Sequence, residues 1–488
     1  MAEQRKTDYV FCGIFKILKK KKKKKKKKKY PDKIMTKTSK KNTVIEVLAE
    51  KIVFPGNVLC RCSDGIALFC EGLLPGETAE VFVTRDKKTF REGKLKNILS
   101  KSSLRKEPEC PSFGKCGGCS FQHTDYKTQL KFKTECVREL LNFTETEIPD
   151  IIESPRQWHY RNKMEFSFFD DNGKLDMGLH EKGSFYKYIG IPPCFIAHQD
   201  IVKTAAIVKE FCIKTELRPY NNKSHEGFFR HLVLRKGINT GDLSVNLVTN
   251  KTETIKDEFW SELTEELKNY ASSVYWTHNS KFSDAVNSEI SSLLYGSPNI
   301  TESLTVYGNT LKFSIAPFSF FQTNTKAAEI LYDTVIKCLD PKKEDCVLDM
   351  YCGTGSIGIC LAPHVKHVTG VEQIEDSIKS ARQNAVLNAI NNVSFSASTA
   401  ENWIKQNTQK FDAVIIDPPR MGLTQPVIEH ILTLAPEKVV YVSCNPSTLA
   451  RDLKIIYAAG GYFAKKIIPV DMFPQTYHIE TVVLLSKT

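Results

Sequence analysis

The sequence predicts a multidomain α/β protein whose C-terminal part is a doubly wound parallel sheet. At 488 residues, of which 41% are hydrophobic, the chain is too long for one compact domain and apolar enough for several cores. From about residue 318 onward, strand-like runs alternate with helix-like ones, as in a parallel sheet with crossover helices. A glycine-rich turn follows the first of these strands, which is typical of sheets that bind a nucleotide.

The N-terminus carries almost all of the net charge. Residues 1–34 hold fifteen Lys or Arg and three acids, so they supply +12 of the +13 and leave +1 for the rest. The lysine run at 19–29 cannot form a packed core, and we expect residues 1–42 to be a disordered leader. It is an RNA-binding arm, a nuclear signal or, in the interpretation we favour, a translated upstream stretch before a start at Met35. Overall charge therefore gives no argument for a nucleic-acid partner.

Apolar patterning and cysteine usage indicate the cytoplasm. No run of eighteen apolar residues occurs, so we expect no membrane span, and the N-terminus is a poor secretory signal. Fifteen cysteines without such a signal argue against a disulfide framework, and most are expected to be core thiols. Two sets stand apart by context: Cys110, Cys116 and Cys119 with the distant Cys194, and Cys444.

Each predicted domain has its own pattern. A small β-barrel is predicted for residues 43–102, because short strand-like runs there are separated by turn signals. The runs are at 43–50, 65–70, 77–85 and 91–98. Residues 103–316 read as a central α+β domain, with helices expected at 125–142, 201–213 and 254–271 and strands at 163–169, 231–236 and 243–248. Residues 317–488 read as the doubly wound domain, with strands expected at 346–351, 367–372, 413–417, 438–443 and 462–469. A last strand at 479–485 is expected at the sheet edge.

The glycine-rich turn predicts a site for an adenosine-containing ligand. Gly353, Gly355 and Gly358 follow a buried-type strand with the G-x-G-x-x-G spacing that lets a backbone approach a ligand closely. The next strand ends in Glu372, whose carboxylate can accept both hydroxyls of a ribose. NAD and S-adenosylmethionine both fit this pattern. Asp349 within the strand and Asp417 at the end of a later strand favour S-adenosylmethionine, since carboxylates suit its cationic amino-acid part.

Cys444 is the candidate nucleophile. It lies at the carboxyl end of the strand expected at 438–443, beside the ligand crevice, where a thiol is placed for attack. A lone cysteine is more often a small core residue. Here a loop and a helix start follow it, so we expect a lowered thiol pKa near a helix N-terminus.

Five motifs resemble the RNA uracil-5 methyltransferase family, a class I family that uses S-adenosylmethionine. They are Phe-Gln322-Thr-Asn, Asp-Met-Tyr351-Cys-Gly-Thr-Gly, Asp417-Pro-Pro-Arg, Ser-Cys444-Asn-Pro and His-Ile-Glu480-Thr. The resemblance covers roughly residues 43–488 and implies a TRAM-like, or OB-like, N-terminal barrel and a Rossmann-like methyltransferase domain. It implies that the cofactor is bound by Gln322, Tyr351, Gly353, Gly355, Ser356, Glu372 and Asp417. The family often has Asn where Ser356 stands.

The resemblance also implies the reaction. Cys444 would attack C6 of a uracil, and the enolate so formed would take the methyl group at C5 from the sulfonium. Glu480 would then remove the C5 proton so that the cysteine can leave. Phe320 and Phe321 could stack on a base, although core packing explains them almost as well.

The cysteine spacing C-x5-C-x2-C, with Cys194 further on, indicates a metal site. Cys110, Cys116, Cys119 and Cys194 would bind a [4Fe–4S] cluster, or zinc as the alternative. Because this set resembles the iron–sulfur 23S rRNA members of the family, 23S rRNA is the preferred substrate and tRNA the first alternative. A dinucleotide-dependent oxidoreductase and a non-catalytic RNA-binding protein are the alternatives of other classes. We expect no membrane partner and infer no protein partner.

Overall fold

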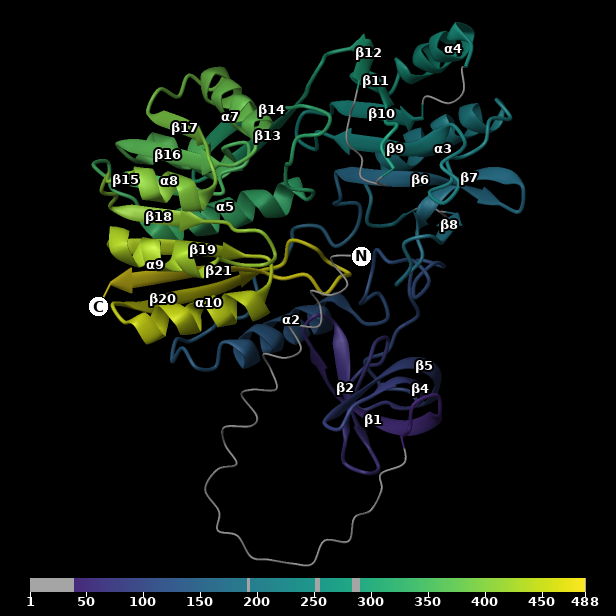
Figure 1. The fold of residues 1–488 in the computed structure, drawn as a ribbon, viewed down its shortest axis with the longest axis horizontal. Helices are drawn as coiled ribbons and strands as arrows, with labels where there is room; N and C mark the ends of the chain where they lie inside the picture. The colour runs from purple at the N-terminus through teal and green to yellow at the C-terminus, as the bar shows by residue number, and fades with distance from the viewer. Residues whose placement is uncertain (1–38, 191–193, 251–254, 283–289, 488) are drawn as a thin grey trace, which may run out of the picture.

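The computed structural model describes residues 39–190, 194–250, 255–282 and 290–487. The leader predicted at 1–42 lies almost wholly outside the described residues. The described chain forms three parts, namely a small barrel, a central sheet with two helices, and a larger α/β unit (Figure 1).

The N-terminal part is a closed five-stranded barrel, which confirms the predicted small barrel. Its strands are β1 (Val44–Val53), β2 (Asn57–Cys62), β3 (Ala67–Cys70), β4 (Thr78–Asp86) and β5 (Phe90–Ser100). The pairing of β1 with both β2 and β4, and of β5 with both β3 and β4, closes it. The prediction missed β2, whose inward positions are Val58, Cys60 and Cys62, so two of its three core residues are cysteines.

The central part is a seven-stranded mixed sheet with the order β12-β11-β10-β9-β6-β7-β8. Its strands are β6 (Lys163–Asp171), β7 (Lys174–His180), β8 (Tyr188–Gly190), β9 (Phe229–Lys236), β10 (Leu243–Thr249), β11 (Ser273–His278) and β12 (Ile290–Gly296). Helices α3 (Gln199–Ile213) and α4 (Asp257–Leu267) pack on one face of it, where they share a hydrophobic core with β6, β9 and β10.

The C-terminal part is a seven-stranded sheet with the order β17-β16-β15-β18-β19-β21-β20. Its strands are β15 (Cys346–Met350), β16 (His367–Glu372), β17 (Val393–Ala397), β18 (Ala413–Ile416), β19 (Lys438–Ser443), β20 (Tyr462–Val470) and β21 (Glu480–Lys487). The first five are parallel, which confirms the doubly wound sheet. Two expectations were wrong: β17 was missed, and β21 lies between β19 and β20, antiparallel to both, so that β20 is the edge strand.

Helices cover both faces of this sheet because alternate residues of each buried strand point to opposite sides. The helices are α5 (Thr325–Leu339), α6 (Ser356–Leu361), α7 (Glu375–Leu387), α8 (Ala400–Gln406), α9 (Gln425–Leu434) and α10 (Pro446–Ala459), with a 3₁₀ turn at Ala362–His364. Val440 of β19 packs with α5, α6 and α7, whereas Tyr441 packs with α8, α9 and α10. The hairpin of β13 (Ile300–Val306) and β14 (Asn309–Ile315) belongs to the core under α5 and α7.

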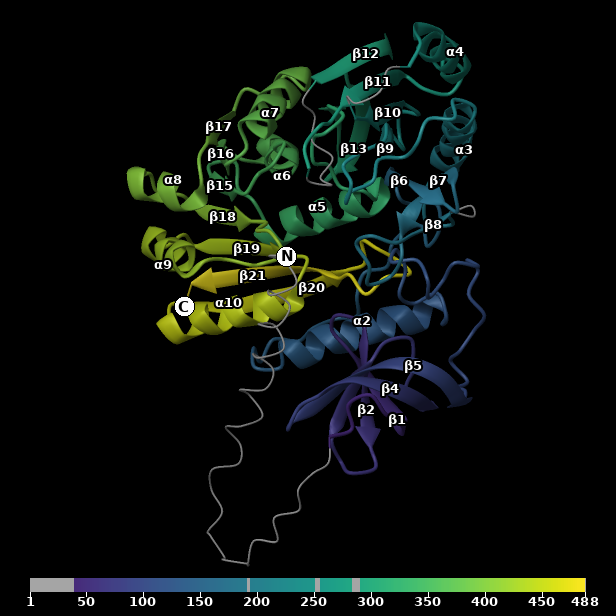
Figure 2. The same cartoon turned by 45° about the vertical axis from the view of Figure 1, so that its right-hand side comes forward.

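Helix α2 (Tyr126–Leu140) joins the barrel to the C-terminal part. It lies between the barrel and α10 in both views (Figures 1 and 2). One continuous core runs from the barrel through Phe132 and Val137 of α2 to Ile467 of β20. The barrel is therefore held against the C-terminal part by shared apolar packing. Among the described residues, no helix is long and apolar enough to cross a membrane.

Candidate active site

The predicted catalytic residues meet at one edge of the C-terminal sheet. Strands β15, β18 and β19 are parallel and in register there, with Met350 beside Ile416 and Ile416 beside Tyr441. Tyr351, Asp417 and Cys444 therefore follow the carboxyl ends of adjacent strands. Because β21 runs the other way and pairs Thr481 with Ser443, its first residue, Glu480, comes to this same edge.

The glycine-rich turn forms a tight loop against β16. Tyr351, Gly353 and Gly355 all have positive φ angles, of 63°, 54° and 77°. A side chain at Gly355 would stand 2.9 Å from the ring of Phe395, so this position requires glycine for space as well as conformation. The amide of Gly353 donates to Oε2 of Glu372 at 3.3 Å. The structure thus brings Gly353, Gly355 and Glu372 together as predicted.

Asp349 is a buried carboxyl whose hydrogen bonding is incomplete. Its Oδ2 accepts the amide of Gly358 at 3.0 Å, while its Oδ1 has no hydrogen-bond partner among the described residues. Burial raises the pKa of Asp349 to about 8, and Asp417 and Glu372 add to the shift. Burial likewise raises the pKa of Asp417 to about 7. Carboxyls crowded in this way favour a ligand that brings positive charge.

Ser356 and Gln322 are positioned by their neighbours. Ser356 is the first residue of α6, and its Oγ lies 3.4 Å from Oγ1 of Thr354. Gln322 lies in the segment between β14 and α5, where its carbonyl accepts Nδ2 of Asn162 at 3.0 Å. This bond anchors the backbone of the segment to the central part of the chain.

The surroundings of Cys444 favour its thiol over its thiolate. Burial, followed by the charge of Glu480, raises the pKa of Cys444 to about 12, and Arg420 opposes this only in part. The expected lowering by the helix N-terminus was wrong. The side chain of Asn445 caps α10 by accepting the amides of Ser447 and Thr448, at 3.1 and 3.4 Å, so these groups do not face the thiol.

Glu480 is also held in its protonated form. It is buried, and burial followed by repulsion from Asp417 raises its pKa well above the ordinary value, while Arg420 lowers it. The surroundings of Cys444 and Glu480, which lie at the ends of neighbouring strands, therefore favour the protonated form of both side chains.

Arg420 is a further candidate for a functional residue, which the sequence reasoning did not single out. Its charge lowers the pKa of both Cys444 and Glu480, and its Nη2 lies 3.3 Å from Nδ1 of His478. Its carbonyl also accepts Nδ2 of Asn445 at 3.1 Å. The sequence feature that could have identified Arg420 is its position directly after Asp417-Pro-Pro, at the end of the same strand.

The two phenylalanines before Gln322 have different roles. Phe321 is 3% exposed and packs against Phe313 in the core, whereas Phe320 is 67% exposed. Only Phe320 is therefore available to stack on a base.

The four cysteines lie near one another without forming a metal-binding group. Cys110 and Cys194 each contribute to raising the pKa of Cys116 and Cys119, although burial is the main cause. The amide of Gly118 donates to Sγ of Cys116 at 3.4 Å. Within the described ranges, no group of three or more His, Cys, Asp or Glu side chains is arranged to hold a metal ion. The predicted cluster remains a prediction.

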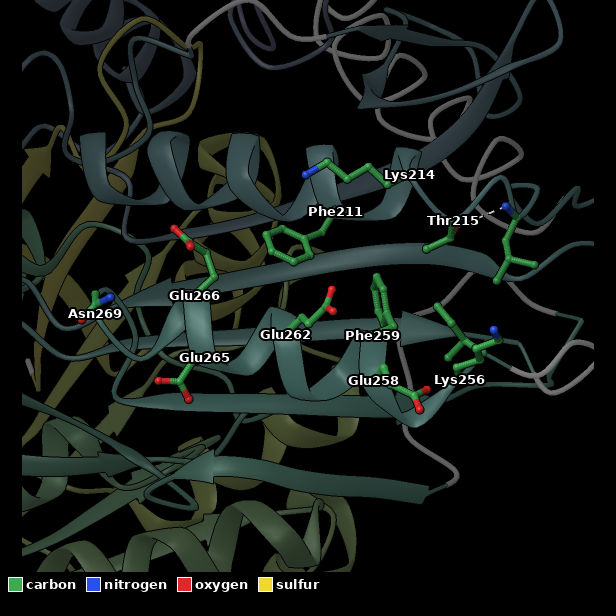
Figure 3. A pocket seen from close by; sticks show the side chains of 12 residues that line it. Phe211, Lys214, Thr215, Lys256, Glu258, Phe259, Glu262, Glu265, Glu266 and Asn269 are labelled. Atoms are coloured by element: carbon green, nitrogen blue, oxygen red, sulfur yellow. Dashed lines mark hydrogen bonds between the residues drawn. The ribbon is translucent and has the colours of Figure 1, made fainter.

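A groove of about 900 Å³ lies elsewhere, between α3 and α4 of the central part (Figure 3). Phe211 and Phe259 line it together with four glutamates of α4. None of the predicted catalytic, cofactor or metal residues lines this groove. The groove is therefore not the candidate active site, despite its size, because the predicted catalytic and cofactor residues lie at the carboxyl ends of the strands of the C-terminal sheet.

Comparison with known proteins identifies the family. The family model described as tRNA (Uracil-5-)-methyltransferase matches residues 125–488. An RNA methyltransferase of Caldanaerobacter subterraneus, described as uncharacterized, is 38% identical over 92% of this chain and 100% of its own length. One from Listeria innocua is 38% identical over 92% and 98%.

A solved structure agrees with this. The tRNA (uracil-54, C5)-methyltransferase of Pyrococcus abyssi, in complex with S-adenosyl-L-homocysteine, is 30% identical and has a TM-score of 0.72. The match covers 90% of this chain and 100% of that one. These likenesses decide against the oxidoreductase alternative. The chain belongs to the tRNA (uracil-5-)-methyltransferase family and is an RNA methyltransferase of that uracil-5 family.

Proposed function

We propose that this protein transfers a methyl group from S-adenosylmethionine to carbon 5 of a uracil in RNA, with Cys444 as covalent nucleophile. The observation that carries the proposal is the meeting of Cys444, Glu480 and Asp417 beside the glycine turn, through the register of β18, β19 and β21. The S-adenosyl-L-homocysteine bound to the Pyrococcus abyssi protein supports the cofactor.

The residues present fit S-adenosylmethionine. The unpartnered Oδ1 of Asp349 and the raised pKa of Asp417 suit a ligand with cationic groups. The left-handed turn at Gly353 and Gly355 is of the kind that lets a ligand approach the backbone closely, and Glu372 lies beside it, where its carboxylate can accept ribose hydroxyls. We assign the remaining contacts to Gln322, Tyr351 and Ser356. When bound, the cofactor supplies a methyl group on a positively charged sulfur.

Cys444 begins the reaction. Its thiolate attacks C6 of the uracil, the Sγ–C6 bond forms, and the electron pair of the C5–C6 bond moves toward O4 as an enolate. C5 then takes the methyl group, and the electron pair of the broken sulfur–methyl bond would stay on the sulfur of the cofactor. Because burial holds the proton on this thiol, the thiolate forms only when positive charge stabilises it. Arg420 does so in part already.

Glu480 completes the reaction as the general base. It takes the C5 proton, the C5–C6 double bond re-forms, and Sγ leaves C6 as a thiolate. Glu480 must be ionised for this step, and Arg420 is the cation that lowers its pKa. Glu480 begins the strand next to Cys444. This position supports the proposal that the Glu480 carboxylate and the Cys444 thiolate act on the same uracil ring. Phe320, which is exposed, is available to stack on that ring.

We propose 23S rRNA as the substrate, because the four-cysteine set resembles that of the 23S rRNA members of the family. A specific observation favours tRNA instead: the related Pyrococcus abyssi structure, which matches 90% of this chain, is named a tRNA methyltransferase. Purified protein with labelled S-adenosylmethionine should methylate one of these two RNAs when both are taken from a strain lacking the enzyme. Nucleoside mass spectrometry should then find 5-methyluridine with wild type and none with Cys444→Ala. Methylation at another atom would overturn the proposal.

We further propose that Cys110, Cys116, Cys119 and Cys194 hold a [4Fe–4S] cluster, with zinc as the alternative. Several N–H groups point at these sulfurs: the amide of Gly118 at Cys116, and those of Ile196 and Ala197 at Cys194. Such donors stabilise metal-bound thiolates, and the cluster would stiffen the loop. Protein prepared without oxygen should be brown and contain iron. Zinc without iron in the metal analysis would contradict the cluster and leave methyl transfer standing.

A further inference from the structure

The loop at 471–479, between β20 and β21, is held from outside its own domain. Three consecutive carbonyls accept hydrogen bonds from the segment at 120–160. Lys133 Nζ donates to the carbonyl of Phe473 at 3.1 Å, and Oη of Tyr160 donates to that of Pro474 at 2.9 Å. The amides of Ser120 and Phe121 donate to the carbonyl of Gln475 at 2.8 and 3.0 Å.

Gln475 is the most constrained residue of this loop. Its φ of 68° lies in the left-handed region, which a residue other than glycine occupies at a cost unless its surroundings hold it there. Gln129 of α2 supplies that hold. The amide of Gln475 donates to Oε1 of Gln129 at 3.0 Å, and Nε2 of Gln129 donates to Oε1 of Gln475 at 2.9 Å. All of these groups are buried.

The loop ends at the general base. Five residues after Gln475 comes Glu480, which begins β21 and lies beside Cys444 through the pairing of Ser443 with Thr481. On the other side, Ser120 follows Cys119 directly, so the cysteine segment is bonded to the same loop. The chain on both sides of Glu480 is therefore held in place. The sheet holds the strand that Glu480 begins, and groups of residues 120–160 hold the loop that precedes it.

We propose that Gln475 and Tyr160 are positioning residues for the general base, and that they fix the 471–479 loop so that Glu480 reaches the C5 proton. This inference rests on the proposed function. It predicts that the main effect falls on one step, because Tyr160 and Gln475 form their hydrogen bonds with neither Cys444 nor the cofactor turn. Attack by Cys444 and methyl transfer proceed normally, while abstraction of the C5 proton and release of the cysteine are slowed.

The first test uses Tyr160→Phe, which removes a single hydroxyl group. Its matched control is Tyr462→Phe, since the Tyr462 hydroxyl donates to another proline carbonyl, that of Pro436, outside the 471–479 loop. In single-turnover reactions with labelled S-adenosylmethionine, denaturing gels separate the methylated protein–RNA adduct from free methylated RNA. Tyr160→Phe should form the adduct at the wild-type rate and resolve it about three- to tenfold more slowly, the ratio expected for one lost hydrogen bond. Tyr462→Phe should resolve it normally.

The second test concerns the paired glutamines. Gln475→Gly keeps the left-handed backbone accessible and removes the hydrogen bond between the two side chains. Gln129→Ala removes that bond together with the acceptor of the Gln475 amide and the bonds from Gln129 to the carbonyls of Phe121 and Thr124. Each should slow adduct resolution, and the double variant should be no slower than Gln129→Ala, because Gln129→Ala already removes the one bond that Gln475→Gly removes. Additive effects, or equal slowing of adduct formation and resolution, would overturn the inference.

The outcomes also separate this inference from the proposed function. If wild-type protein forms no denaturant-resistant adduct, even with RNA containing 5-fluorouracil, the proposed function itself fails. If wild type forms that adduct and Tyr160→Phe and Gln475→Gly resolve their methylated adducts at the wild-type rate, only the positioning roles fail.

Discussion

Buried carboxyls dominate the candidate active site at the scale of single residues. Asp349, Asp417 and Glu480 all have raised pKa values because burial disfavours their charged forms, and each lies near another carboxylate. Such a site is costly for the unliganded protein at neutral pH. A cationic ligand offsets that cost, which links cofactor binding to stability.

Asp349→Asn tests this link. In unliganded protein the Asp349 pKa is about 8, above the ordinary 3.8, so the folded state binds the proton more tightly. Stability is then lost as pH rises from about 4 to about 8. The side-chain amide that this substitution introduces still has an oxygen that can accept the backbone N–H of Gly358, and it cannot ionise. Asp349→Asn should therefore raise the free energy of unfolding at pH 8.5, by on the order of 1–3 kcal/mol.

At pH 4.5 the same variant should be close to wild type. Denaturant unfolding at the two pH values measures the difference, and calorimetry should show weaker binding of S-adenosylmethionine. A variant that was less stable than wild type at pH 8.5 would contradict the raised pKa of Asp349.

The places of the candidate site residues could be predicted from the sequence because local motifs contain them. Glu372 ends β16 and meets the glycine turn, as expected from the strand–turn–helix pattern. The protonation state of Cys444 could not be predicted, because it depends on burial and on Glu480, which is distant in sequence. Arg420 was missed for the same reason, since its effect on the thiol and on Glu480 appears only in three dimensions.

At the scale of elements, β21 and α10 bring the two proposed catalytic residues, Cys444 and Glu480, together. Strand β21 inserts between β19 and β20, which places its first residue, Glu480, beside the end of β19. This order could not be predicted, because an apolar strand with the pattern of β21 suits either an edge or a central position in a sheet. Strand β17 was missed because only one of its five residues, Phe395, is buried.

Asn445→Ala should weaken both the cap of α10 and catalysis. Its side chain accepts two amides of α10 and donates to the carbonyl of Arg420. Loss of a cap costs about 0.5–2 kcal/mol. Thr399→Ala is the matched control, because Thr399 caps α8 away from Cys444. Both variants should lower the unfolding midpoint, and only Asn445→Ala should lower kcat. Equal kcat values would show that the cap does not position the thiol.

At the scale of the whole molecule, the barrel and α2 are part of one folded body with the C-terminal sheet. Nζ of Lys133 in α2 forms a buried ion pair with Oδ1 of Asp471 at 2.7 Å, and Oη of Tyr126 donates to Oδ2 of Asp471 at 2.9 Å. Pattern reasoning identified the barrel and helix separately. Their joint packing was not predictable, because the partners of Lys133 and Tyr126 lie more than 300 residues away.

Lys133→Met should be strongly destabilising, since it leaves Asp471 buried without its cation. The expected loss is about 3–5 kcal/mol. Lys51→Met is the control: Lys51 pairs with Glu139 at an exposed position, and such a pair contributes about 0–1 kcal/mol. Denaturant unfolding followed by circular dichroism would compare them. A similar small loss in both variants would contradict the buried link.

Removal of residues 1–34 should leave turnover nearly unchanged. These residues carry +12 of the net charge, so their loss should mainly weaken non-specific RNA binding and flatten its dependence on salt. Filter binding at two salt concentrations and turnover at physiological salt check this. A large fall in turnover would show that the lysine run is a working RNA-binding arm.

The central claim is that Cys444 and Glu480 act in successive steps on one uracil, and the most direct test compares Cys444→Ala with Glu480→Gln. Both are incubated with RNA and labelled S-adenosylmethionine and run on denaturing gels. Cys444→Ala should give neither adduct nor methylated RNA. Glu480→Gln should accumulate a denaturant-resistant, methyl-labelled adduct and turn over about 10²–10⁴-fold more slowly. Release of methylated RNA by Glu480→Gln at the wild-type rate would contradict the account.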